Sequence, residues 1–383
     1  MAGRFRAGAT LFAFGEGAGA TDAQHVAVEF LHPVVVGKPA LPALSLANDA
    51  ATVTALARRV GVDRVFADQL ATLAAPGDIA LGITGAGESR AVSAGLDEAK
   101  RRGLLTVALT GTETGAGDTL DHVLAVDTSD PLVGKELQVT TYHVLWEVVH
   151  LLLDQPGTAS DHAAGEARED GALAGLYPFL YGQQGDAGEL LASLTASTAE
   201  KADEIVALRV EVGERCCDDI ATCANEMAAR FADGGRLLTF GNGGSSTDAA
   251  EVASLAMAPP VGRPLPALGL ANDVATVTAL ANDVGVEAIF SRQIATLGRR
   301  GDVAMALSTS GGSANVLAGL QESSRRGLLT VGLAGYDGGR MAEAGLLDHL
   351  FVVPSASIHR IQEAQTTVYH VLMELVWAAL GRV

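Results

Sequence analysis

The sequence has few cysteines and few aromatic residues. Only three cysteines occur among 383 residues, Cys216, Cys217 and Cys223, and the aromatic residues make up 4% of the chain. Three cysteines clustered in one predicted helix exclude a disulfide scaffold and argue against a cysteine-rich metal site. We interpret them as small apolar packing residues of a reduced, cytoplasmic protein.

Positive charge and long apolar runs are also scarce. Lys and Arg number 26 against 45 Asp and Glu, which gives a formal net charge of −19 at pH 7. Such a balance argues against nucleic acid or an anionic membrane as the partner. No apolar run approaches the roughly 18 residues of a membrane span. An anionic small ligand is still compatible, because local backbone dipoles outweigh a global charge at contact distance.

The main feature that is present is an internal duplication. Residues 41–81 and 265–305 are identical at roughly 26 of 41 aligned positions, far above chance. The pairing extends to residues 12–25 with 238–251 and to residues 136–149 with 363–376. A period of about 225 residues is the size of a domain, so the sequence predicts two tandem domains.

Each copy alternates short apolar runs with helical stretches, which predicts an α/β fold. In the second copy we expect strands at residues 236–240, 266–270, 302–307, 329–334 and 349–354, and a closing helix from about His359 to Leu380. Five parallel strands of this kind predict a flavodoxin-like, doubly wound sheet flanked by helices. Such sheets bind ligands at the carboxyl ends of their strands.

The expected domain boundaries are a first copy at residues 1–153, a linker rich in Gly, Ala, Asp and Pro at 154–186, and a second copy at 187–383. Helical periodicity over residues 187–233 predicts two helices before the second sheet. The start of the chain superficially resembles a signal peptide. Because it aligns with residues 227–241 of the second copy, we interpret it as a helix end and a first strand.

Two glycine-rich turns of the second copy each follow a predicted strand and open a helix. They read GNGGSSTDAA (Gly241–Ala250) and STSGGSANV (Ser308–Val316). The first is a weak signal alone, because such turns are common. The second surrounds free backbone N–H groups with hydroxyls, the donors that a phosphate monoester needs. The plainer interpretation is a helix N-cap with spare serines.

With these segments in order, the second copy resembles the SIS (sugar isomerase) domain family, and specifically the bacterial phosphoheptose isomerases. The matching segments are GNGGSSTDA, NDVG…IFSRQ, GDVAMALSTSGGSANV and RIQEAQTTVYH, and they span nearly all of residues 236–380. The resemblance implies a site for a sugar phosphate. The residues that it assigns to the phosphate and the sugar are Asn242, Gly243, Ser245, Asp283, Ser308, Thr309, Ser310, Ser313 and Gln362.

The same resemblance implies one zinc ion. Its ligands are a His-x-x-x-Glu pair on the helix after the first glycine-rich turn, and a Gln and a His on the last helix. Residues four or eight apart share one helix face, as ligands of one ion must. The first copy supplies His25 and Glu29, and the second supplies Gln362 and His370.

The two copies lack different parts of this site. The second copy has Glu251 and Leu255 in place of the metal-binding His and Glu, and the first has Lys135 in place of the Gln. The first copy also reads ITGAGES in place of LSTSGGS, which puts Glu88 where it would repel a phosphate. Neither copy is complete alone. The pattern predicts a composite site, with the metal helix of one copy and the phosphate loop of the other.

The implied reaction is an aldose–ketose isomerisation, most directly of sedoheptulose 7-phosphate to D-glycero-D-manno-heptose 7-phosphate. It proceeds by proton transfer between adjacent carbons through an enediol(ate) and needs a base, an acid and oxyanion stabilisation. Glu29 is the expected carbon base and His370 the opposing acid and base, with His143 as the alternative to His370. The zinc would polarise the substrate oxygens.

Two other functions fit the same sequence. One is a non-catalytic sugar-phosphate-binding regulator or scaffold of the SIS family, and the other is an isomerase of another phosphorylated ketose. Metal content separates the first of these from the isomerase. The family forms homotetramers with sites at subunit interfaces, so the resemblance implies self-association, here a homodimer that makes a pseudo-tetramer of SIS domains.

Overall fold

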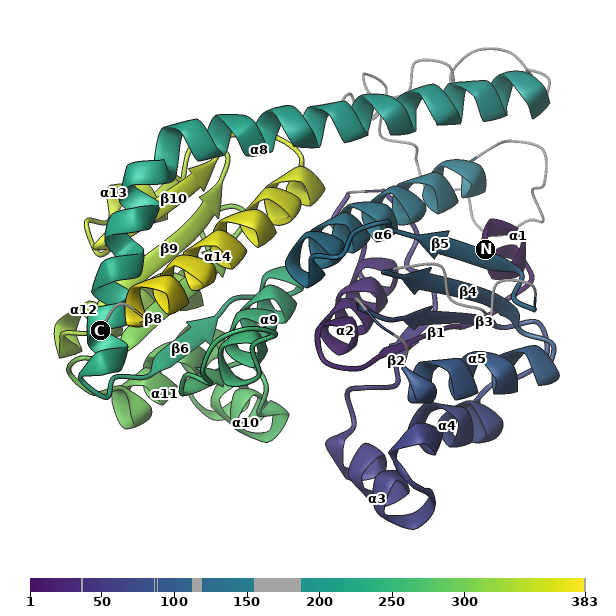
Figure 1. Cartoon of the computed structure of the whole chain (residues 1–383), viewed down its shortest axis with the longest axis horizontal. Coiled ribbons are helices and arrows are strands. Elements are labelled where there is room, and N and C mark those ends of the chain that lie inside the picture. Colours follow the sequence, from purple (N-terminus) through teal and green to yellow (C-terminus); the bar gives the residue numbers. More distant parts are fainter. Residues whose placement is uncertain (36, 86, 88, 112–118, 155–186, 382–383) are drawn as a thin grey trace. The chain divides into compact units, whose positions relative to one another are not determined.

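The computed structural model describes residues 1–35, 37–85, 87, 89–111, 119–154 and 187–381 (Figure 1). The chain divides into two compact units. Unit 1 comprises residues 1–16, 26–127 and 137–206, and unit 2 comprises residues 17–25, 128–136 and 207–383. Two short segments of the first copy therefore belong to unit 2. Nearly all of the expected linker, residues 155–186, lies outside the described residues.

Unit 1 contains a five-stranded parallel sheet. Its strands are β1 (Leu11–Gly15), β2 (Ala43–Ser45), β3 (Ile79–Ile83), β4 (Leu105–Thr110) and β5 (His122–Ala125), in the order β2-β1-β3-β4-β5. The helices that carry residues of the first copy are α1 (Ala2–Arg6), α2 (Ala18–Leu31), α3 (Ala50–Val60), α4 (Val65–Leu73), α5 (Arg90–Arg101) and α6 (Pro131–Leu153). The first turns of α2 and α6 belong to unit 2.

Unit 2 repeats this sheet. Its strands are β6 (Leu237–Phe240), β7 (Ala267–Gly269), β8 (Val303–Ser308), β9 (Leu329–Gly335) and β10 (His349–Val353), all parallel and in the order β10-β9-β8-β6-β7. Its helices are α9 (Gly244–Met257), α10 (Val274–Asp283), α11 (Ile289–Leu297), α12 (Ala314–Arg326), α13 (Gly339–Glu343) and α14 (Ile358–Leu380). Read from the first strand of each copy, both orders are the flavodoxin-like 2-1-3-4-5. The predicted fold class is confirmed.

The expectation of two helices before the second sheet is wrong. Residues Ala187–Ala232 form the single helix α8, 46 residues long. The segment contains no proline, and a Cβ added at its mid-helix Gly213 would meet nothing within 4 Å. One exposed glycine costs a helix only about 1 kcal/mol, which is too little to end it. None of the described helices is long and apolar enough to cross a membrane.

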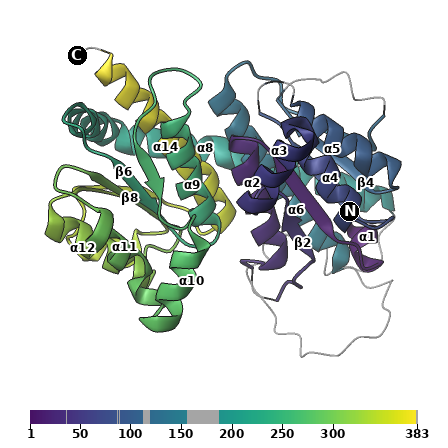
Figure 2. The ribbon, with the colours of Figure 1, turned by 90° about the horizontal axis from the view of Figure 1, so that it is seen from below.

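The core of unit 2 lies between the sheet and the pair α11 and α12, while α9 and α14 cover the other face (Figure 2). All six residues of β8 are buried, as expected for a strand with helices on both faces. Phe240 and Phe290 pack with ring centroids 5.2 Å apart. Gly319 in α12 makes room for them, because a Cβ there would lie 2.8 Å from the Phe240 ring.

Replacing Gly319 with Val should therefore destabilise unit 2. Extra methyl groups in a filled core typically cost about 1–3 kcal/mol. Urea denaturation followed by circular dichroism should show a lower midpoint for Gly319→Val. The control is Gly213→Ala in α8, where the added Cβ meets no neighbour and should leave the midpoint unchanged or raise it. Equal midpoints for the two variants would contradict this packing.

Candidate functional site

The two glycine-rich turns open at one edge of the sheet in unit 2. β6 leads into α9, β8 leads into α12, and the two strands pair in parallel from Leu237 and Val303. Their carboxyl ends therefore lie side by side, with two helix N-termini above them. Each N-terminus offers unpaired N–H groups and the positive end of a helix dipole, so the edge suits an anion.

The serine-rich turn after β8 keeps hydroxyls available. Ser308 is buried, and its Oγ lies 3.4 Å from Oγ of Ser313. Ser313 is the N-cap residue of α12 but makes no side-chain capping bond. Ser310 Oγ accepts from the backbone N–H of Gly312 at 3.2 Å. Thr309 completes the turn and accepts at its carbonyl from Gly335 N at 2.9 Å.

The shape of this turn is fixed by close backbone packing. Gly311 has φ of +60°, and a Cβ there would collide with the carbonyl oxygen of Gly338 in the loop after β9. The carbonyl of Gly311 accepts from Met341 N at 2.9 Å. The backbone donors are thus held in place before any ligand binds, which is what phosphate recognition by a loop requires.

The turn after β6 is tied to the serine-rich turn. The side-chain amides of Asn242 and Asn315 exchange two hydrogen bonds of 2.9 and 2.8 Å. Gly243, with φ of +54°, precedes α9, and Ser245 is buried in its first turn. Asp283, which the sequence assigned to the sugar, lies exposed at the C-terminal end of α10 and accepts from the amide of Asn282 at 2.7 Å.

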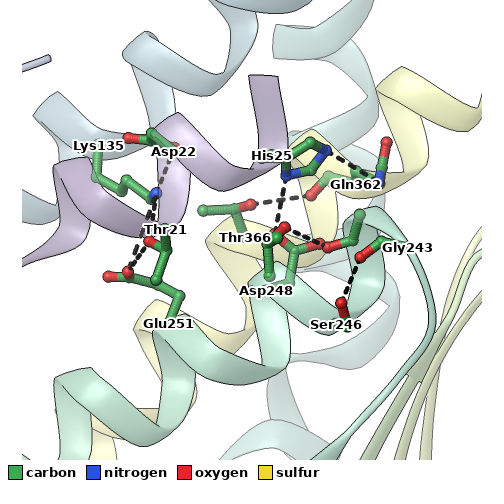
Figure 3. Close-up of polar contacts among 12 residues, drawn as sticks. Thr21, Asp22, His25, Lys135, Gly243, Ser246, Asp248, Glu251, Gln362 and Thr366 are labelled. Carbon is green, nitrogen blue, oxygen red and sulfur yellow. Dashed lines mark hydrogen bonds and ion pairs between the residues drawn. The ribbon is translucent and has the colours of Figure 1, made fainter. Parts of the chain in front are cut away.

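Three buried side chains meet at the start of α9 in unit 2 (Figure 3). Gln362 Nε2 of α14 donates to His25 Nε2 of α2 at 3.2 Å, across 337 residues of sequence. The other ring nitrogen of His25 lies 3.7 Å from Asp248 Oδ1 of α9. Gly244 makes this meeting possible, because a Cβ there would lie 2.8 Å from His25 Nε2 and would overlap the Gln362 amide.

Gln362 Oε1 and His370 Nε2 are among the buried atoms of α14 that have no hydrogen-bond partner in the described part of the chain. The opposite nitrogen of His370 lies 3.0 Å from Glu136 Oε1, and Thr367 donates to the same carboxylate at 2.6 Å. A carboxylate on one ring nitrogen orients an imidazole and presents the other nitrogen to a ligand. Both unpaired atoms are therefore candidates for contact with a substrate or a metal.

The predicted ligand Glu29 lies one helical turn beyond His25 in α2, is buried, and belongs to unit 1. Its backbone carbonyl accepts from Trp146 Nε1 at 2.8 Å. His143, the alternative to His370, is buried in α6, also in unit 1. Across the described ranges of the chain, no three His, Cys, Asp or Glu side chains are grouped so that they could hold a metal ion.

The corresponding turn of the first copy is closed by its own side chains. Ser89 caps α5 by accepting from Val92 N at 3.1 Å, and it also bonds the carboxylate of Glu16. Its counterpart Ser313 makes no such cap. Glu88, which the sequence predicted to repel a phosphate, lies outside the described residues. The hydroxyl presented in unit 2 is thus used for capping in unit 1.

Sequence reasoning did not single out Asp248, Glu136, Asn315 or Gly244. A signal existed for the two carboxylates, since Asp248 recurs in the first copy as Asp22 and Glu136 recurs in the second as an acid at the same place. The role of Gly244 could not be read in this way, because its counterpart is an alanine.

Comparison with known proteins points to one family. A family model of the SIS domain matches residues 1–111 and 202–335. The phosphoheptose isomerase of Paramagnetospirillum magneticum is 43% identical over 187 residues, which cover 48% of this chain and 94% of that protein. The phosphoheptose isomerase of Aquifex aeolicus is 41% identical over 165 residues, 43% of this chain and 85% of that protein.

A solved structure resembles the whole chain. The C-terminal domain of glucosamine-fructose-6-phosphate aminotransferase from Francisella tularensis aligns with a TM-score of 0.62 at 12% identity, and covers 99% of this chain and 87% of that one. At this identity the likeness shows the shared fold alone.

Gly244→Ala should disrupt the contact between His25 and Gln362. The added methyl group cannot be placed without moving one of these side chains, and overpacking at a buried position costs about 1–3 kcal/mol. The imidazole resonances of His25 should shift in NMR spectra, and the thermal midpoint should fall. Ser246→Ala, at a half-buried position of the same helical turn that does not contact His25, is the control. Unchanged His25 resonances in Gly244→Ala would contradict the described site.

Proposed function

We propose that this chain, which belongs to the SIS domain family, is an aldose–ketose isomerase of a phosphorylated sugar. The carrying observation is the pair of unpartnered buried atoms, Gln362 Oε1 and His370 Nε2, in the unit that also presents the serine-rich turn. Gln362 contacts the turn after β6 at Gly244, and that turn is bonded to α12 through Asn242. A phosphate site and unsatisfied polar groups thus belong to one connected set of side chains.

The proposed substrate is sedoheptulose 7-phosphate, converted to D-glycero-D-manno-heptose 7-phosphate. Support comes from relatives named phosphoheptose isomerase, one of which is 43% identical and covered over 94% of its length. The serine-rich turn would hold the phosphate through Ser308, Ser310 and Ser313. Charge-assisted bonds from hydroxyls and backbone N–H groups to a dianion are strong enough to anchor the sugar while its other end reacts.

In the proposed reaction, a base removes the proton from the carbon next to the carbonyl and returns it to the former carbonyl carbon. Glu29 is the proposed base. His370 would move a proton between the two substrate oxygens through Nε2, with Glu136 holding the ring through Nδ1. By holding the ring at Nδ1, Glu136 would keep Nε2 directed to this exchange.

The donors present suit a zinc ion in their chemistry. Gln362 Oε1 and His370 Nε2 are unpartnered and buried, and His25 presents Nε2 towards Gln362. With the carboxylate of Glu29 they would make a nitrogen and oxygen set of the kind that zinc takes. Because Glu29 and His370 Nε2 cannot hold the ion and carry a proton at once, their coordination would be loose or exchanging. Zinc held there would act as a Lewis acid on the carbonyl oxygen. Asp248, near Nδ1 of His25, would orient that ring.

The proposed site is composite, because its residues come from both copies of the repeat. His25 and Glu29 belong to the first copy, and Gln362, His370 and the serine-rich turn belong to the second. The contact of His25 with Gln362 supports this arrangement. We also propose a homodimer in which four sheet domains form a pseudo-tetramer. A monomeric mass at micromolar concentration would contradict the dimer.

Phosphate recognition should depend on the second copy. Ser310→Ala combined with Ser313→Ala should weaken binding of sedoheptulose 7-phosphate by roughly 1–3 kcal/mol, through loss of charge-assisted hydrogen bonds. The control is Thr84→Ala combined with Ser89→Ala, which removes two hydroxyls from the corresponding turn of the first copy. Isothermal titration calorimetry measures both. Equal losses in the two double variants would show that the assignment is wrong.

Glu29→Gln should abolish turnover and leave substrate binding nearly intact. Removal of a general base typically costs 10²–10⁴-fold in rate, roughly, while the phosphate contacts remain. A coupled assay of heptose phosphate formation gives kcat, and calorimetry gives the affinity. Glu343→Gln, at an exposed position of α13, serves as the control. Full activity of Glu29→Gln would exclude the composite site, and sugar-phosphate binding by a wild-type protein without turnover would favour the regulator.

A further inference from the structure

A second buried polar cluster lies in unit 2, centred on Lys135 of α6 (Figure 3). Its ammonium group pairs with Asp22 of α2, lies 4.0 Å from Glu251 Oε2 of α9, and reaches the carbonyl of Ala18 at 3.3 Å. Thr21 donates to the same carboxylate of Glu251. Lys135, Asp22 and Glu251 are 6%, 0% and 4% exposed, so water does not solvate these charges.

This cluster is the internal repeat of the site around His25. Glu251 aligns with His25, Asp22 aligns with Asp248, and Lys135 aligns with Gln362. In the first cluster, His25 comes from the first copy, and Asp248 and Gln362 come from the second. In the cluster around Lys135, Glu251 comes from the second copy, and Asp22 and Lys135 come from the first. The two clusters are therefore the same arrangement with the copies exchanged.

The two arrangements differ in what they can hold. Around His25, the imidazole lies between Asp248 and the Gln362 amide, and Asp248 Oδ2 has no partner among the described residues. In the cluster around Lys135, the side chain itself supplies a cation, the ammonium group that pairs with Asp22. Burial lowers the pKa of Lys135, but the charges of Asp22 and Glu251 outweigh that effect and raise it, so the ammonium group stays charged.

The residue in the first turn of the helix beside each cluster, Gly244 or Ala18, also differs between the two clusters. Gly244 stands at the His25 cluster, where a Cβ would overlap the Gln362 amide. Its counterpart is Ala18, which carries a Cβ and offers its carbonyl to Lys135. Only the cluster without a built-in cation needs the extra space.

We propose that Lys135 fills, with its own ammonium group, a second divalent-metal position that is equivalent by duplication to the one at His25 and Gln362. This inference rests on the proposed function for the identity of the ion, which is zinc. Its own claim concerns two aligned residues of the last helices. Lys135 supplies the cation of one position, and Gln362 leaves the other position open. One chain then has one open and one permanently filled cation position.

Exchanging residues between the two positions tests this claim. Glu251→His, Lys135→Gln and Leu255→Glu together should open the filled position, the last change supplying the counterpart of Glu29. His25→Glu with Gln362→Lys should close the open one. Zinc per chain is measured by mass spectrometry of the metal after equilibrium dialysis of the full-length protein, and the thermal midpoint is measured with added Zn²⁺ and with a chelator. We expect one additional zinc in the opened variant and one fewer in the closed variant. The midpoint of the opened variant should rise with Zn²⁺.

The control is Glu211→His with Arg215→Gln, which introduces His and Gln into an exposed ion pair of α8. It should leave zinc content and midpoint unchanged. An opened variant that folds but gains no zinc and no Zn²⁺-dependent stability overturns the proposal. If the opened variant does not fold, the closed variant decides: retention of wild-type zinc overturns the proposal.

The outcomes separate the two proposals. Wild-type protein without zinc would exclude the proposed zinc centre at His25, while the opened variant would still test Lys135. If wild-type protein holds no zinc and the opened variant does not fold, Lys135→Met decides. It leaves two buried carboxylates without their cation, and its midpoint should fall by roughly 6–20 °C. An unchanged midpoint would overturn the cation role of Lys135.

Discussion

The parallel pairing of β6 with β8 is the constraint on which the site in unit 2 depends. Parallel strands end at the same edge, so the helices that follow them, α9 and α12, begin side by side. The edge would be incomplete without Gly244 and Gly311, whose missing side chains let α14 and the loop after β9 approach. Backbone geometry thus places the donors, and the polar side chains are added to a frame already in position.

This local geometry makes the proposed phosphate site compatible with a net charge of −19. At the serine-rich turn the nearest polar groups are hydroxyls and the backbone N–H groups at the start of α12, the positive end of the helix dipole. The global negative charge is screened over roughly 8 Å at physiological salt, whereas the contacts to a phosphate are near 3 Å. The local dipoles therefore decide the sign of the ligand.

Much of the fold follows from periodicity, because each strand of unit 2 is a short apolar run bounded by glycines or charges. The strands observed there begin and end within a residue or two of those expected, and α14 begins one residue before His359. Periodicity predicted helical structure before the second sheet correctly but not the number of helices, because a continuous backbone leaves no break between residues 187 and 232. The turn at Ser308 could be predicted from its glycines and serines, and the duplication from the repeated segments.

Contacts between distant side chains were harder to foresee. The sequence identified Lys135 only as the residue in place of the metal-binding Gln, since it does not show that Asp22 and Glu251 surround the ammonium group. Asp283 appeared as a sugar ligand by resemblance, yet the end of α10 is exposed and Asn282 contacts it there. Such positions depend on how helices cross, and a pattern along one helix does not contain that angle.

Tandem duplication gives this chain a freedom that a symmetric dimer of identical subunits lacks. In such a dimer, a substitution that places Lys in one cation position places it in the other as well, and both positions close together. When the copies are joined in one sequence, Lys135 and Gln362 can differ. A buried carboxylate pair needs a nearby cation, and a lysine meets that need at any metal concentration. One position can therefore serve stability while its equivalent stays free for a ligand.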